Sequence, residues 1–136
     1  MTGIGGSVRI VVRYRDGRLL KGTTQDFFPN KPVFHLQEEG KGASEVVNVE
    51  VSELKALFFV KTLEGERTHH IPKGLETAAG VGRRLRVIFT DGESLIGFTV
   101  GCNRLAPGFF ITPADTEGNN ERVFVVNMAV KAIEWL

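Results

Sequence analysis

The sequence has few of the residues on which covalent cross-links, membrane insertion or polyanion binding depend. Cys102 is the only cysteine among 136 residues, so no internal disulfide can form and a cytoplasmic location is expected. Seventeen basic and sixteen acidic residues leave a formal net charge of +1, without the positive excess typical of nucleic-acid-binding proteins. No apolar run is long enough to span a bilayer, and no signal-peptide pattern begins the chain. We therefore expect no membrane association, and nucleic acid is a disfavoured partner.

The sequence also lacks a pattern that would place a metal or a catalytic group. His69 and His70 are neighbours in an irregular segment, where adjacent side chains point apart, and His35 has no carboxylate cluster near it in sequence. Cys102 lies close to Arg104, which could lower its pKa, but a catalytic thiol also needs a base. We expect no metal, no cofactor, no catalytic residues and a non-enzymatic protein.

What the sequence does contain is a repeat. The phrase D-G-x-x-L-x-G begins at Asp16 and recurs 75 residues later at Asp91, and PVFHL at Pro32 recurs at the same offset as PGFFI at Pro107. LKALFF at Leu54 returns 76 residues later as VKAIEW, as one residue inserted in a loop would produce. These offsets predict an internal duplication.

Strand patterns dominate each copy. Val8, Ile10, Val12 and Tyr14 alternate with polar or exposed positions, and the Asp-Gly pair that follows is a strong hairpin signal. Gly22 favours a sharply bent second strand. Sixteen glycines and 42% hydrophobic residues are typical of a globular protein rich in tight turns. These patterns predict an all-β protein in which two tandem small five-stranded antiparallel barrels pack together.

The predicted boundaries divide the chain into three parts. Residues 7–65 form the first barrel repeat and residues 83–136 the second. Residues 66–82 between them contain Gly, Thr, Pro and two histidines without sustained periodicity, which indicates a linker. Whether the repeats form separate barrels or one merged sheet is left open at this point.

The start of each repeat resembles the first motif of Sm-like proteins, which form bent five-stranded barrels. The shared pattern is the alternating strand of Val8, Ile10 and Val12, followed by D-G-x-x-L-x-G and then Asp26. No Arg-Gly pair with a following aliphatic residue occurs where the second Sm motif would carry nucleotide contacts. The resemblance therefore implies a barrel, and RNA binding only by analogy.

Four phrases are similar to an uncharacterised bacterial domain family associated with PilZ and two-component signalling proteins. They are TTQDFFPN at Thr23, LKALFFVK at Leu54, GFF at Gly108 and NNERVFV at Asn119. The resemblance extends over nearly the whole chain and implies a regulatory setting inside a bacterial cell. It transfers no catalytic residue.

A PilZ barrel would suggest cyclic di-GMP, which is held by an Arg-x-x-x-Arg arm and an Asp/Asn-x-Ser-x-x-Gly strand. Arg9 and Arg13 have the arm spacing, but they share the solvent face of a predicted strand. Ser94 and Gly97 match the second element only in part, because Gly92 stands where Asp or Asn is required. A nucleotide sensor of this type is the alternative function, with a cleft expected where Arg9, Arg13 or residues 83–86 converge.

The loops offer the best candidate for a protein-binding surface. Two consecutive phenylalanines cannot both point inward from a strand, so Phe28 is expected outside if Phe27 enters the core. Cover by the other repeat is one interpretation of that ring, and a free binding patch is the other. The candidate surface residues are Phe27, Phe28, Pro29, Asn30, Asn103, Arg104, Asn119 and Asn120.

These observations favour a non-enzymatic adaptor or regulatory protein-binding module in bacterial signalling. The partner is a protein of unknown identity, and a homodimer through unused sheet edges is a second option. A small-ligand or nucleotide sensor is the alternative, followed by RNA binding.

Overall fold

The structure, a computed structural model, describes residues 7–42, 45–65, 70–77 and 80–136. Within these ranges the regular elements are strands and three-residue 3₁₀ turns, which confirms the all-β prediction. The strands of the first half are β1 (Val8–Tyr14), β2 (Leu19–Thr24), β3 (Val33–Glu38), β4 (Val46–Glu50) and β5 (Leu54–Val60). Those of the second half are β6 (Arg83–Phe89), β7 (Ser94–Thr99), β8 (Gly108–Pro113), β9 (Asn120–Val126) and β10 (Val130–Trp135). The 3₁₀ turns are η1 (Val51–Glu53), η2 (Leu75–Thr77) and η3 (Asn127–Ala129).

The Asp-Gly pairs form the two hairpin turns that the sequence predicts. Gly17 and Gly92 have φ values of 96° and 92°, a left-handed conformation that glycine adopts without steric cost. Asp16 Oδ1 accepts a hydrogen bond from the Arg18 amide at 3.0 Å, and Asp91 Oδ1 accepts one from the Glu93 amide at 2.9 Å. Each aspartate thus stabilises its own turn.

Gly22 and Gly97 allow close approach of the third strand in each half. A Cβ on Gly22 would lie 2.1 Å from the Gln37 carbonyl oxygen, and one on Gly97 would lie 2.5 Å from the Thr112 carbonyl oxygen. No side chain fits there, so the missing Cβ lets the backbones of β3 and β8 approach β2 and β7 closely.

Two buried threonines at the 75-residue offset make the same contact. Thr24 Oγ1 donates to the His35 carbonyl at 2.8 Å, and Thr99 Oγ1 donates to the Phe110 carbonyl at 2.9 Å. Each hydroxyl lies at the end of β2 or β7 and gives a hydrogen-bond partner to a backbone carbonyl of β3 or β8.

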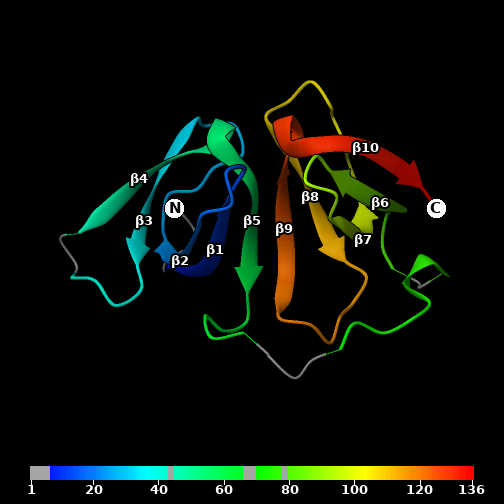
Figure 1. Ribbon diagram of the computed structural model, residues 1–136, viewed down its shortest axis with the longest axis horizontal. Coiled ribbons are helices and arrows are strands. Elements are labelled where there is room, and N and C mark those ends of the chain that lie inside the picture. The colour runs from blue at the N-terminus through cyan, green and yellow to red at the C-terminus, as the bar shows by residue number, and fades with distance from the viewer. Residues whose placement is uncertain (1–6, 43–44, 66–69, 78–79) are drawn as a thin grey trace.

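All strand pairings are antiparallel, and they form one open ten-stranded sheet in the order β10-β6-β7-β8-β9-β5-β1-β2-β3-β4. Figure 1 shows β5 and β9 side by side in the middle, with β1–β4 on one side and β6–β8 and β10 on the other. We expected two closed barrels, and the structure instead has a single open sheet. Closing each half would require β5 to pair with β4 and β10 to pair with β9, but β5 and β9 pair with each other instead.

Two hydrophobic cores lie on the two sides of this central pairing. The first contains Phe34, Leu36 and Val49, and the second contains Leu85, Val87 and Ile111. The halves are not independent, because Phe124 and Val126 of β9 pack into the first core and Ala56 of β5 packs into the second. The predicted linker includes η2, while residues 66–69 and 78–79, His69 among them, lie outside the described residues. Its role as a domain boundary stays a prediction.

Candidate functional site

The pairing of β5 with β9, which we call the joint, is the place where the two halves create surfaces that neither has alone. Leu57 lies opposite Phe124, and Phe58 lies opposite Val123. Side chains on alternate faces of both strands enter opposite cores, as strand geometry requires. A concave surface is found at each end of the joint.

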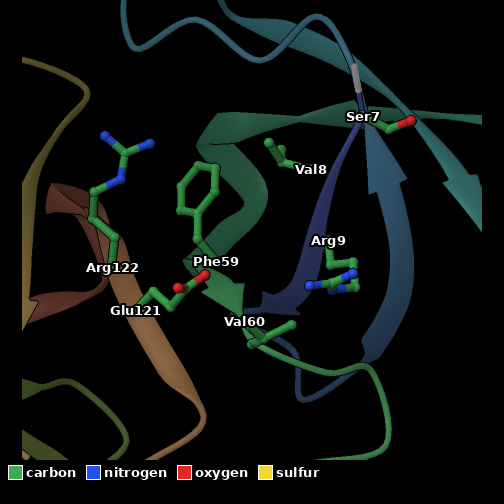
Figure 2. Close-up of a pocket in the computed structure, with 7 residues that line it drawn as sticks. All are labelled: Ser7, Val8, Arg9, Phe59, Val60, Glu121 and Arg122. Carbon is green, nitrogen blue, oxygen red and sulfur yellow. The ribbon is translucent and has the colours of Figure 1, made fainter. Parts of the chain in front are cut away.

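At the first end, β1, β5 and β9 surround a hollow of about 440 Å³, which Figure 2 shows. An adjoining hollow of about 240 Å³ shares Val8, Phe59 and Arg122 with it. We call the two together the joint cleft. The larger hollow is further lined by Ser7, Arg9, Val60 and Glu121, and the smaller one by Thr24, Gln25, Phe27, Pro29 and Phe110.

The floor of the cleft is a cluster of aromatic rings from both halves. Phe27 lies in T-shaped contact with Phe34 at 5.2 Å and with Phe124 at 5.1 Å between ring centroids. Phe59 and Phe110 adjoin the same cluster. Such contacts add to the stability gained from burial alone, so the floor is a rigid part of the joint.

Arg122 lies over this floor. Its guanidinium carbon is 4.5 Å from the ring centroids of both Phe59 and Phe110, within cation–π range. In the described residues no carboxylate lies within ion-pair distance of Arg122 or Arg9. Within the described residues, the cleft therefore presents two arginines without an ion-pair partner beside an aromatic surface, and the Glu121 carboxylate is also part of its lining.

The predicted loop Phe27–Asn30 is divided by the structure. Phe27 is half-buried and packs against the first core, and Phe110 and Phe124 of the second half contact its ring. Phe28 stays 45% exposed, and Lys31 Nζ lies 4.7 Å from its ring centroid. Pro29 lines the joint cleft, while Asn30 is exposed.

At the opposite end of the joint lies a hollow of about 400 Å³, the joint groove, which includes Arg104 from the candidate surface. Two apolar side chains of its lining are open to solvent: Leu105 is 98% exposed and Met128 is 62% exposed. The remaining lining residues are Pro32, Val51, Ser52, Ala106, Pro107, Val126 and Asn127. Residues of the first half and the second half thus form one apolar depression.

The polar residues beside the groove hold its shape. Asn127 Nδ2 donates to the carbonyls of Asn103 and Ala106, and Arg104 donates to Asn127 Oδ1 at 2.8 Å. Asn103 Oδ1 accepts from the Leu105 amide at 3.0 Å. Asn103 and Arg104 thus organise the loop that presents Leu105.

Asn119 and Asn120 lie where β9 begins and line neither concavity of the joint. Asn119 bonds to Thr62 in both directions: its Oδ1 accepts from the Thr62 amide at 3.0 Å, and its Nδ2 donates to the Thr62 carbonyl at 2.9 Å. Both asparagines line a separate hollow with Ile71, Leu95 and Pro113. The eight predicted surface residues are therefore spread over distinct surfaces.

The arginines expected to converge on a nucleotide do not do so. Arg13 pairs with Glu93 at 3.2 Å, and Arg86 pairs with Glu134 and Glu76. Arg83 stacks over Trp135 at 4.0 Å, at the outer side of the second half. Only Arg9 of this set lines the joint cleft, and its companion there is Arg122.

Sequence reasoning missed an ionic cluster across the joint. Lys55 of β5 is only 4% exposed, and its Nζ contacts Asp91 Oδ2 at 2.6 Å and Glu93 Oε1. The hydrogen bond from Lys55 lowers the pKa of both carboxyl groups below their ordinary values. The signal in the sequence was a lysine inside the apolar run Leu54–Val60, where a charge must find a partner.

Other titratable groups form no recognisable catalytic set in the described part of the chain. Asp26 Oδ2 bonds His35 Nδ1 at 2.6 Å, and the hydrogen bonds from His35 and Thr24 lower the pKa of Asp26 although partial burial opposes this. No hydroxyl or thiol is hydrogen-bonded to the His35 ring among these residues. Burial raises the pKa of the Cys102 thiol, and Arg104 opposes this only weakly. No group of three metal-ligating side chains occurs in the same ranges.

Among the described residues, no helix has the length and apolar character needed to cross a bilayer.

Comparison with known proteins identifies a family without adding a site. No curated protein and no solved structure matches the chain. A match does extend over residues 6–136, both halves and the joint included, and by it the chain belongs to a family of unknown function, DUF6982.

Proposed function

We propose that the protein is a non-enzymatic protein-binding module of adaptor or regulatory type, and that its partner docks in the joint groove. The observation that carries this proposal is the exposure of Leu105 and Met128 around an apolar depression. Large apolar side chains that lie together in solvent mark interaction sites more often than isolated ones do. Methionine adapts to the shape of a bound side chain, which suits it to this role.

The occupant we propose is an apolar side chain on an extended segment of another protein. A volume of about 400 Å³ accommodates one or two large side chains rather than a folded element. Arg104 keeps its positive charge, because its partners Asn127 and the Val130 carbonyl are neutral, but these hydrogen bonds hold its guanidinium against the protein. Recognition would therefore depend on apolar contact, with the exposed Ser52 and the loop backbone at the rim.

The internal duplication belongs to the same proposal. Copying an all-strand unit would place the fifth strand of one copy beside the fourth strand of the other, and this pairing forms the groove. The equal contacts of Thr24 and Thr99 support a common origin of the halves. A bacterial signalling setting and a cytoplasmic location rest on sequence alone and stay predictions.

The test is affinity capture from the native cell with matched variants. Leu105→Glu places a charge in the groove and should abolish recovery of a specific partner. Val100→Glu is the control, because Val100 is 89% exposed but does not line the groove. Site-specific cross-linking from position 128 should then place an apolar segment of that partner in the groove.

Equal recovery of the same proteins by Leu105→Glu and the wild type would contradict the proposal. So would equal loss of the partner in Leu105→Glu and Val100→Glu, because a general increase in surface charge would then explain both results.

A further inference from the structure

The joint cleft has a feature that the proposed protein-docking site does not use. Arg13, Arg18 and Arg86 each pair with a carboxylate. Arg9 and Arg122 have no such partner in the described residues, and both line the larger hollow. In Figure 2 they lie on opposite sides of the hollow, with Phe59 and Glu121 between them.

The position of Arg122 determines what this hollow can hold. Its planar guanidinium is fixed against two phenylalanine rings, so less conformational entropy is lost when its N–H groups bind a ligand. An arginine held in this way suits a phosphate or carboxylate, which accepts charge-assisted hydrogen bonds. Arg9 provides a second cation in the same hollow.

The rest of the lining suits a flat ring with polar edges. Phe27, Phe59 and Phe110 line the smaller hollow together with Pro29, and rings stack well on such surfaces. Gln25 and Thr24 offer amide and hydroxyl groups there, while Glu121 offers an acceptor in the larger hollow. Hollows of about 440 and 240 Å³ that share three residues are within the size range of small-molecule sites.

We infer that the joint cleft binds a small organic anion that carries a flat ring, of the nucleoside monophosphate class. The phosphate binds to the guanidinium of Arg122, with Arg9 as the second cation, and the ring lies against Phe27 and Pro29, beside the Phe59 and Phe110 rings that Arg122 covers. The Glu121 carboxylate accepts a hydrogen bond from a ring N–H or a ribose hydroxyl. Its negative charge also disfavours longer polyphosphates.

The test is calorimetric titration of the full chain with GMP, with guanosine and with inorganic phosphate. We expect GMP to bind, and both fragments to bind at least tenfold more weakly. Arg122→Gln and Arg9→Gln should each weaken GMP binding about tenfold or more, the usual effect of losing a charge-assisted hydrogen bond. Amide NMR shifts on GMP addition should concentrate at Val8, Phe59 and Arg122.

The matched control is Arg83→Gln, which removes an arginine stacked on an aromatic ring far from the cleft. Thermal unfolding of each variant verifies that it is folded, and Arg122→Lys provides a second, milder change at the same position. Three results would overturn the inference: no GMP binding at millimolar concentration, phosphate binding as tight as GMP binding, or equal weakening by Arg83→Gln. Groove variants such as Leu105→Glu should leave GMP binding unchanged, so this site and the docking site can fail separately.

Discussion

The two strands of the joint and the two strands at the ends of the sheet occupy corresponding places in the duplication that the sequence predicts, yet their surfaces differ. At an offset of 76 residues, β9 corresponds to β4 and β5 corresponds to β10. Phe124 is 1% exposed in the joint, and its counterpart at the free edge is the exposed Asn48. Phe58 packs against the second core, and its counterpart is the exposed Glu134. At these two positions the side chain is apolar in the joint strands and polar in the strands at the ends of the sheet.

The charged groups show the same contrast. Lys55 is buried among Asp91, Glu93 and the Phe89 ring, whereas its counterpart Lys131 is exposed. The counterpart of Glu93 is Arg18, which could not accept a hydrogen bond from a lysine. Polar and charged residues on an edge strand oppose further pairing. The comparison therefore indicates a sheet that ends at ten strands.

The largest effect should follow from removing the central ring of the joint. Phe124→Ala would leave a cavity between Phe27 and Phe110 and should lower the free energy of unfolding by about 3–5 kcal/mol. Asn48→Ala, at the corresponding edge position, should change it by less than about 0.5 kcal/mol. Urea denaturation followed by the fluorescence of Trp135, the only tryptophan, measures both. Equal effects of the two variants would contradict the contrast between joint and edge.

A smaller loss should follow from removing the buried lysine. Lys55→Ala leaves Asp91 and Glu93 without their shared donor, but both carboxylates are about half exposed and water can replace it. We expect a loss of about 1–3 kcal/mol in the free energy of unfolding, partly from the packing of the lysine stem. Lys131→Ala is the matched control and should be nearly neutral.

The same cluster predicts a pH dependence. Lys55 lowers the folded-state pKa of Asp91 and Glu93 below the ordinary values of these groups, 3.8 and 4.5. Their contribution to stability is present above those values and is lost as the pH falls through the lower folded-state pKa. Unfolding midpoints should therefore decrease between about pH 5 and pH 2, and the decrease should be shallower in Lys55→Met than in wild type. Parallel curves for the two proteins would show that the cluster does not contribute.

Local chemistry explains which parts of the fold could be predicted from sequence. The Asp-Gly turns at Gly17 and Gly92 follow from the need for positive φ, and Gly22 marks a backbone approach that no Cβ permits. The pairing of β5 with β9 involves residues sixty or more positions apart, and nothing local specifies it. Phe124 lies in the continuous apolar run Val123–Val126, which indicates burial but does not say in which core.

The functional surfaces were less predictable for the same reason. Phe27 and Pro29 were expected at a protein-binding surface, and both line the smaller hollow of the joint cleft. Arg122 and Leu105 were not among the candidate surface residues, because the concavities that they line are completed by residues of the other half. A lysine in an apolar run, as at Lys55, was the one local signal of a contact across the joint.

The smallest expected effect comes from making the free edges resemble the joint. If a second chain repeated the joint, β4 of one copy would pair with β10 of the next, with Asn48 opposite Ile133 and Glu134 opposite Val47, by analogy with Leu57–Phe124 and Phe58–Val123. The double variant Asn48→Phe with Glu134→Phe should therefore associate head to tail, weakly and with increasing concentration. Sedimentation velocity measures this.

The wild type should sediment as a single chain over the same concentrations, and so should the polar control Asn48→Ser with Glu134→Gln. A wild-type oligomer held together by β4 and β10 would contradict the view that the polar edges end the sheet. It would instead support the homodimer option that the sequence left open. Weak association of the phenylalanine variant alone would show that apolar side chains at these two positions are enough to let the free edges pair.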